Sequence, residues 1–274
     1  MEGWTGVLHL NAEDRKGKTV AKNVYFQGAL KVMRPIYHDD SGRACYYLLN
    51  PGGGYLDGDR YQMKIGLGEN AKLTLTTQGA TKVYKTLKSF AYQESEISLA
   101  AGSYLEYFPD PLIAYQHAHY KQKNVITMDS SATLLYTDII TPGWSPQGDR
   151  FSYKTVQLLN EIYVDGELVV YDHLHLKPSV QNIKGLGFME GFTHLGSMIV
   201  ICNQMNSSFL DQVHSKIEGN SFDYKVGLSL LPVSGFTVRV FANLTQDIEK
   251  IFSDIHRYIS QEWFQAKQYS LRKY

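Results

Sequence analysis

Cysteine is scarce in this sequence, because the 274 residues include only Cys45 and Cys202, far apart in the chain. They form no C-x-x-C pair, which argues against a zinc ribbon, and two distant thiols are not a disulfide framework. Proline is also sparse, and no Pro/Ser-rich linker divides the chain. We therefore expect a single domain over residues 1–274 that folds in a reducing compartment.

Net charge is absent as well, since 27 Lys and Arg residues balance 27 Asp and Glu residues. Without excess positive charge, neither nucleic acid nor an anionic membrane is an expected partner. No run of about 18 apolar residues occurs, and no basic segment followed by an apolar stretch begins the sequence. We expect no membrane span and no signal peptide, and these features together favour the cytoplasm.

Most of the chain alternates apolar and polar residues with a period of two, which is typical of half-buried strands. The alternation is clearest in residues 72–77, 103–107 and 236–240. Asp165 and Gly166 separate two such segments, 161–164 and 167–170, and this dipeptide predicts a tight hairpin. The pattern predicts a mainly β protein.

Two late segments break this period. Near residues 244–266 the apolar residues recur at spacings of three and four, which predicts a long C-terminal helix with one apolar face. The residues of that face are Ile248, Ile251, Phe252, Ile255, Ile259 and Trp263. A shorter helix is predicted near 207–218, where Ser207 can cap the first turn.

Glycines are concentrated at residues 52–54, yet no nucleotide site is predicted there. No Lys-Ser/Thr pair and no helical pattern follow them, so the criteria of a P-loop are not met. We expect a tight loop with positive φ at these glycines, and turn capping by Asp57 and Asp59 on either side of Gly58. The residues alone show no catalytic set and no tight cofactor site.

Two further patterns leave alternatives open. Glu106 and Asp110 could act as an acid–base pair in a carbohydrate-active hydrolase or lyase, although spacing alone does not select them among the chain's acidic residues. The pairs His117/His119 and His173/His175 each place two imidazoles on one face of a strand, a geometry that transition metals accept. Exposed strand histidines with no metal are the other interpretation. A free-standing β binding module is a third class of function.

Three stretches of sequence resemble the signature of the urease accessory protein UreD (UreH) family, in the same order and spacing. They begin at Gly52, Thr76 and Leu105, and the resemblance runs from Trp4 to the C-terminal helix. The signature residues are Gly52, Gly53, Gly54, Gly58, Asp59, Arg60, Thr76, Thr77, Gln78, Lys82, Tyr84, Pro109, Asp110 and Pro111.

The resemblance implies a fold of stacked, β-helix-like sheets and a function as a non-enzymatic accessory protein. Such a protein acts in the cytoplasm with UreF and the GTPase UreG, binds the urease apoprotein, and receives nickel from UreE as the donor. GTP hydrolysis would then belong to UreG. The resemblance also implies that Ni²⁺ passes through a polar interior route.

Weak oxygen ligands suit such a route, because a tight His/Cys cage would trap the ion. The acidic candidates, in or beside predicted strands, are Asp59, Glu106, Asp110, Asp138 and Glu161. For each of them, a surface or turn-capping acid is the competing interpretation.

Overall fold

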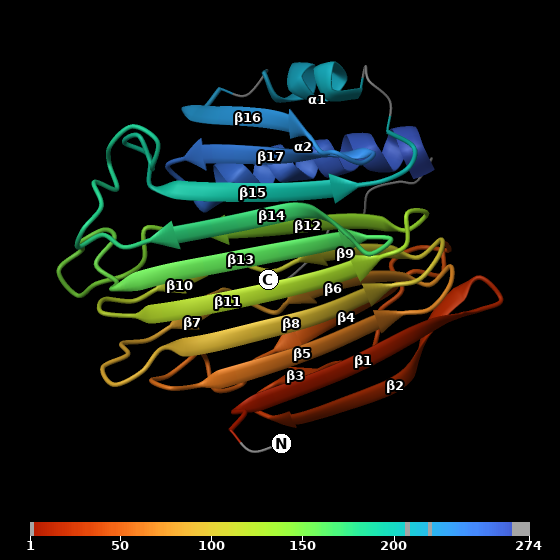
Figure 1. Ribbon diagram of the computed structural model, residues 1–274, viewed down its shortest axis with the longest axis horizontal. Helices are drawn as coiled ribbons and strands as arrows, with labels where there is room; N and C mark the ends of the chain where they lie inside the picture. The colour runs from red at the N-terminus through yellow and green to blue at the C-terminus, as the bar shows by residue number, and fades with distance from the viewer. Residues whose placement is uncertain (1–2, 206–208, 219–220, 265–274) are drawn as a thin grey trace.

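The computed structural model describes residues 3–205, 209–218 and 221–264, which form two facing β-sheets with two helices at one end (Figure 1). The seven-stranded sheet has the order β14–β13–β11–β8–β5–β1–β2. Its strands are β1 Gly6–Arg15, β2 Lys18–Gly28, β5 Arg60–Leu67, β8 Ala91–Leu99, β11 His119–Met128, β13 Thr155–Val164 and β14 Glu167–Leu176.

The ten-stranded sheet has the order β16–β17–β15–β12–β9–β6–β4–β3, with the short strands β7 and β10 attached beside β12. Its strands are β3 Lys31–Val32, β4 Ala44–Leu49, β6 Lys72–Thr77, β7 Thr81–Val83, β9 Tyr104–Phe108, β10 Leu112–Ala114, β12 Thr133–Ile140, β15 His194–Ile201, β16 Tyr224–Leu230 and β17 Gly235–Ala242. The two helices are α1 Phe209–Ile217 and α2 Thr245–Phe264.

From β4 to β13 the chain passes back and forth between the two sheets, apart from the short β7 and β10. Strands β5, β8, β11 and β13 are therefore parallel, and so are β4, β6, β9 and β12. Parallel strands of this kind are normally covered on both faces. The winding confirms the prediction of a mainly β fold with stacked, β-helix-like sheets.

The tight turn between β13 and β14 was predicted from the Asp-Gly dipeptide and is confirmed. Asp165 has φ +48° and Gly166 has φ +86°, the two positive values that a type I′ hairpin turn needs. Both helices are also confirmed. The predicted cap Ser207 and residues 265–266 lie outside the described residues.

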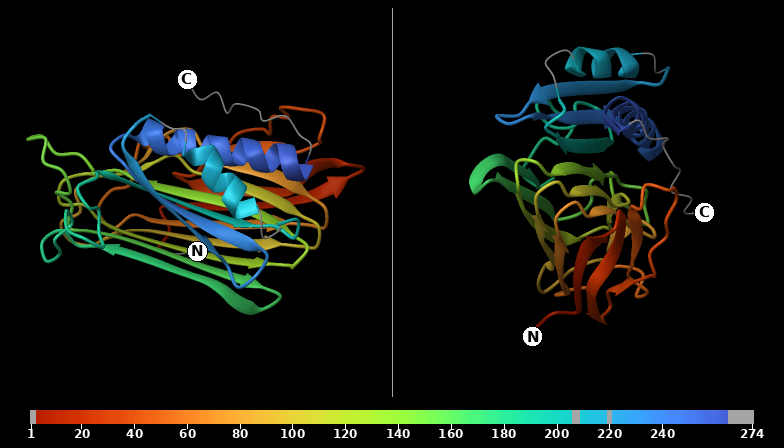
Figure 2. Two further views of the ribbon diagram at one scale, coloured as in Figure 1. Left: turned by 90° about the horizontal axis from the view of Figure 1, so that it is seen from above. Right: turned by 90° about the vertical axis from the view of Figure 1, so that its right-hand side faces the viewer.

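Helix α2 covers the outer face of the ten-stranded sheet over β15 and β17 (Figure 2). Ile248, Ile251 and Ile255 are fully buried on the face turned to the sheet. Gly196 on β15 permits this close approach, because a Cβ atom there would lie 2.4 Å from the Cγ2 atom of Ile248. The sheet is consequently buried on both faces where α2 crosses it. Within the described part of the chain, no helix is long and apolar enough to cross a membrane.

Candidate functional site

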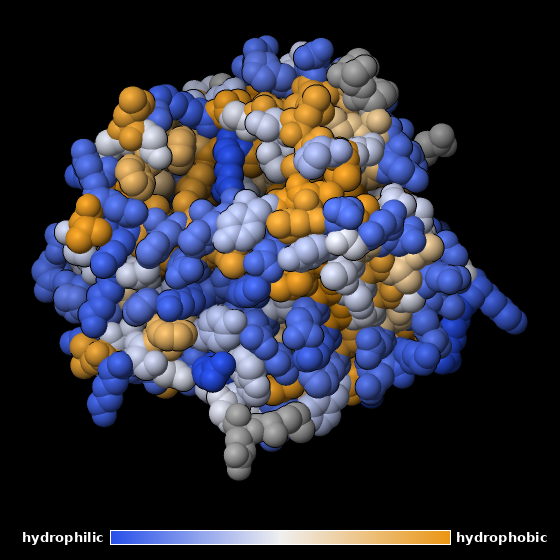
Figure 3. Space-filling model, in the orientation of Figure 1, coloured by the Kyte–Doolittle hydropathy of each residue, from blue (hydrophilic) through white to orange (hydrophobic). Residues whose placement is uncertain are grey.

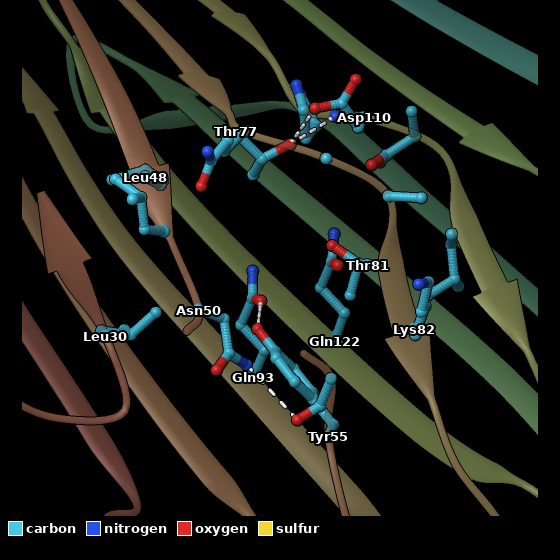
Figure 4. A pocket seen from close by; sticks show the side chains of 18 of the residues that line it. Leu30, Leu48, Asn50, Tyr55, Thr77, Thr81, Lys82, Gln93, Asp110 and Gln122 are labelled. Carbon is cyan, nitrogen blue, oxygen red and sulfur yellow. Dashed lines mark hydrogen bonds between the residues drawn. The ribbon is translucent and has the colours of Figure 1, made fainter. Parts of the chain in front are cut away.

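A cavity of about 380 Å³ lies between the two sheets (Figure 4). Apolar side chains such as Leu48 and Leu158 form part of its wall, and a set of polar groups converges from both sheets. Such a mixed lining is typical of binding sites. The polar lining residues are Asn50, Thr77, Gln78, Thr81, Lys82, Gln93, Asp110, Gln122 and Asp138.

The parallel register of the seven-stranded sheet places the glutamines of the cavity. Gln93 on β8 pairs with Tyr61 on β5 and with Gln122 on β11. Paired positions in neighbouring strands share one face, so the three side chains form an inward row. Gln93 is buried, and its Oε1 atom accepts a hydrogen bond of 2.5 Å from the Tyr55 hydroxyl.

Asp110 lies on the opposite side of the cavity, just after β9. The Thr77 hydroxyl donates to Asp110 Oδ2 at 2.8 Å and accepts from the Asp110 backbone N–H at 2.7 Å. This reciprocal pair joins the end of β6 to the end of β9, as the dashed lines in Figure 4 show. The bond from Thr77 thereby holds one carboxylate oxygen of Asp110, a site residue predicted from the sequence, at the cavity wall.

Asp138 on β12 lines this cavity and also a smaller hollow of about 10 Å³ beyond it. The wall of the hollow includes Asn160, Asp172 and Arg239, and an ion pair joins the last two. Hydrogen bonds connect the region, since Asn124 Nδ2 donates to Asn160 Oδ1 at 2.8 Å. We call Gln93, Gln122, Asn124, Tyr136, Asp138, Asn160 and Asp172 the interior polar row.

The sequence analysis missed the interior polar row except for Asp138. A signal was present on β11, because Gln122 and Asn124 continue the alternate positions of Ile126 and Met128, which are buried. Lys121 and Lys123 occupy the other face, so both faces of the strand are polar at that end. The alternation of apolar and polar residues therefore does not show which face points into the protein.

Burial sets the protonation behaviour of Asp138. Desolvation raises its pKa to about 6, against the opposing hydrogen bonds from Tyr136 and Asn160, and the nearby Asp172 raises it further. Burial likewise raises the pKa of Tyr61, which lies beside Gln93 on the neighbouring strand β5, to about 12. Near neutral pH the row therefore holds a carboxylate that is partly desolvated and is easily protonated by mild acid.

The raised pKa of Asp138 predicts a pH-dependent effect of Asp138→Asn on stability. Because the folded-state pKa lies above the unfolded value, the stabilising effect of protonation is complete below about pH 4 and is lost as pH rises through about 6. Asp138→Asn should therefore be about 1–2 kcal/mol more stable than wild type at pH 7.5, after allowance for partial exposure. Thermal melts at pH 4 and pH 7.5 measure this, and an equal difference at both values would contradict it.

Glu106 lies outside the cavity. Its neighbours Leu105 and Tyr107 point between the sheets, whereas Glu106 is fully buried on the outer face, beneath α2. Glu106 Oε1 lies 2.6 Å from Arg43 Nη1 and 2.7 Å from His256 Nε2. Its other oxygen accepts a 2.6 Å hydrogen bond from Thr74. We call Glu106, Arg43, His256, Tyr104 and Thr74 the buried ionic cluster.

Burial would raise the pKa of Glu106, but His256, Arg43 and Thr74 together hold it well below its usual range. The carboxyl group therefore stays ionised and is fully occupied by the cluster. It has neither the exposure nor the proton of a general acid, and it does not share a cavity with Asp110.

The two remaining acidic candidates are separate from the cavity lining. Asp59 precedes β5 and accepts hydrogen bonds from Leu56 N at 2.7 Å and from the Thr5 hydroxyl at 3.0 Å, as a turn-capping acid does. Glu161 lies on the outer face of β13, 3.1 Å from Lys123 Nζ. In the described residues, no three His, Cys, Asp or Glu side chains are placed to hold one metal ion.

The signature stretches meet at the cavity although they are distant in sequence. Gly53 has φ +79°, the left-handed conformation expected for this loop. At Gly54 a Cβ atom would lie 2.7 Å from the Lys82 carbonyl oxygen, so only glycine lets the loop pack against the Lys82 segment. The signature residues that line the cavity are Gly53, Gly54, Thr77, Gln78, Lys82, Pro109 and Asp110.

Comparison with known proteins identifies the family of this chain. The sequence model of the family described as UreD urease accessory protein matches residues 5–273. A urease accessory protein UreD from Lachnoclostridium phytofermentans is 42% identical over 274 residues, which is 100% of both chains. One of the same name from Staphylococcus aureus is 45% identical over 273 residues, covering 99% of this chain and 98% of the relative. The chain therefore belongs to the UreD family of urease accessory proteins.

Proposed function

We propose that this chain supports the loading of nickel into apo-urease, with Asp110 and the interior polar row forming a route for Ni²⁺ between the sheets. The observation that carries the proposal is the shared cavity of Asp110 and Asp138, which adjoins the hollow at Asp172. Carboxylate, amide and hydroxyl oxygens bind Ni²⁺ less tightly than imidazole or thiolate groups, which suits a cargo that must be released.

The partners in this proposal are those of the family. The chain would act in the cytoplasm with UreF and the GTPase UreG on the urease apoprotein, with UreE as the nickel donor and no tightly bound cofactor of its own. The sequence between Gly52 and Arg60 has no Lys-Ser/Thr pair for a triphosphate, so GTP hydrolysis is assigned to UreG. A carbohydrate-active enzyme is not favoured, because Glu106 is held in the buried ionic cluster.

The role of Asp138 predicts that Asp138→Asn lowers urease activation several-fold when nickel is limiting. The amide keeps the shape of the side chain but removes the charge that attracts a divalent cation. Urease activity and bound nickel, measured in cells that express the structural and accessory genes, test this. Because the variant is expected to be more stable than wild type at neutral pH, a loss of activation could not be attributed to unfolding.

Glu161→Gln is the matched control, since it removes one carboxylate from the outer face of β13 rather than from the cavity. It should activate urease to the wild-type level. Co-purification of the accessory complex verifies that both variants assemble. Full activation by Asp138→Asn at limiting nickel would reject the proposed route.

A further inference from the structure

A second, separate cavity of about 680 Å³ opens at one end of the molecule, where β11 and β13 begin and β14 ends. We call it the end cavity. None of its lining residues belongs to the interior polar row. In the view of Figure 1 these strand ends lie at the left, and the left side of the surface in Figure 3 is mostly hydrophilic with a few hydrophobic residues among the others. Its lining residues are His117, His119, Phe151, Ser152, Tyr153, Lys154, Thr155, Lys177, Pro178 and Ser179.

The charges of the end cavity are all of one sign. Lys154 and Lys177 carry positive charge, His117 and His119 add two imidazoles, and the lining identified in the described chain includes no Asp or Glu. Elsewhere on the outer face of the same sheet, lysines have acidic partners, as Lys64 has Glu96 at 2.9 Å and Lys123 has Glu161 at 3.1 Å. The end cavity differs from that face in collecting positive charge without a carboxylate.

The environment of His119 agrees with this charge distribution. Burial lowers the pKa of His119, and the neighbouring charges of Lys121, Lys154, His175 and Lys177 lower it further. Lys121, Lys154 and Lys177 are cationic at neutral pH. An anion in the cavity would relieve their mutual repulsion.

Two hydroxyl groups of the end cavity are buried without a hydrogen-bond partner among the described residues. They are Ser152 Oγ and Tyr153 OH. Tyr153 is only 3% exposed, so its hydroxyl is cut off from bulk water as well. Buried polar groups in folded proteins almost always have a partner. Both hydroxyls belong to residues that line the end cavity, and a ligand there that accepts hydrogen bonds would supply the missing partner.

The backbone around the cavity is held in an unusual conformation. His117 has φ +65°, a left-handed value that is uncommon for a residue other than glycine. Its N–H donates to the Ser152 carbonyl at 3.0 Å, and the backbone N–H groups of Lys154 and Thr155 both donate to the Ala118 carbonyl. These bonds fix the start of β11 against the segment that leads into β13, and they hold the backbone of His117 against that of Ser152.

We propose that the end cavity binds a small oxyanion of the phosphate class, either free phosphate or the phosphate group of a small metabolite. The site combines ammonium groups, imidazoles and hydroxyl donors around a concave space, which are the groups that recognise an acceptor-only, multiply charged anion. A volume of about 680 Å³ leaves room for a phosphate ester. The proposal is independent of the nickel route, because it uses different residues and a ligand of opposite charge.

Isothermal titration of the full chain with inorganic phosphate, at constant ionic strength, tests the proposal. Saturable binding is expected, and Lys154→Gln and Lys177→Gln should each weaken it about tenfold. Tyr153→Phe should also weaken it, although that variant removes an unpartnered buried hydroxyl and so should not lower the melting temperature. Lys64→Gln is the control, because it removes one lysine charge from the same sheet outside the cavity and should bind as wild type does.

A titration with acetate and one with glucose 6-phosphate complete the experiment. Weaker binding of acetate supports the phosphate class, and tighter binding of the ester than of free phosphate identifies a metabolite rather than the free ion as the ligand class. The proposal is overturned if phosphate shows no saturable binding at millimolar concentration, if acetate binds equally well, or if Lys64→Gln weakens binding as much as the cavity variants do.

Discussion

Glu106→Ala is expected to lower the free energy of unfolding by about 3–5 kcal/mol, because it removes the carboxylate from a cluster of buried charges. Arg43 and His256, whose side chains are only 11% and 9% exposed, would lose their common partner. The variant also loses the contact between Glu106 on β9 and His256 on α2. Urea unfolding of wild type and variant at pH 7.5 measures the difference.

The pH dependence of that difference is a second readout of the same variant. The folded-state pKa of Glu106 is depressed, so its contribution is fully present above about pH 4 and is lost as pH falls toward the folded-state value. The difference in free energy of unfolding between Glu106→Ala and wild type should therefore become smaller in acid. Glu161→Ala, whose partner Lys123 is 41% exposed, is the control and should change stability by less than about 1 kcal/mol. Equal stability of Glu106→Ala and wild type at pH 7.5 would contradict the role of the cluster.

Ile255→Asp is expected to lower the free energy of unfolding at least as much as Glu106→Ala does. Ile255 is fully buried between α2 and the sheet, so the variant loses apolar burial and places an unpaired carboxylate in the same space. We expect a loss of about 4–5 kcal/mol or failure to fold. Soluble yield and melting temperature are the measurements.

Gln261→Asp provides the comparison, because it adds the same charge to an exposed position of the same helix. It should change stability by less than about 1 kcal/mol. If Ile255→Asp kept the yield and melting temperature of Gln261→Asp, the packing of α2 on the sheet would have to be rejected.

Local sequence patterns predicted the elements whose signals are short-range. The three- and four-residue spacing from Ile248 onward predicted α2, and the Asp-Gly dipeptide predicted the hairpin at Asp165. Both signals lie within one element or one turn. The stacked arrangement of the sheets came from the family resemblance, because no periodicity states which strands become neighbours.

The site was harder to predict because it depends on register and on distant contacts. The strand from Tyr104 to Phe108 alternates as expected, but both of its faces are buried, one between the sheets and one beneath α2. Glu106 and Asp138 were therefore grouped as one kind of site although they face different surroundings. The partner of Glu106, His256, lies 150 residues away and carries no local signal.

The most direct test of the maturation role is the nickel content and activity of urease purified from cells that express its structural and accessory genes, with and without this chain. The proposed function predicts apo-urease when the chain is omitted, and nickel-loaded, active urease when it is restored. Equal nickel content and equal activity in the two preparations would contradict a role for this chain in urease maturation.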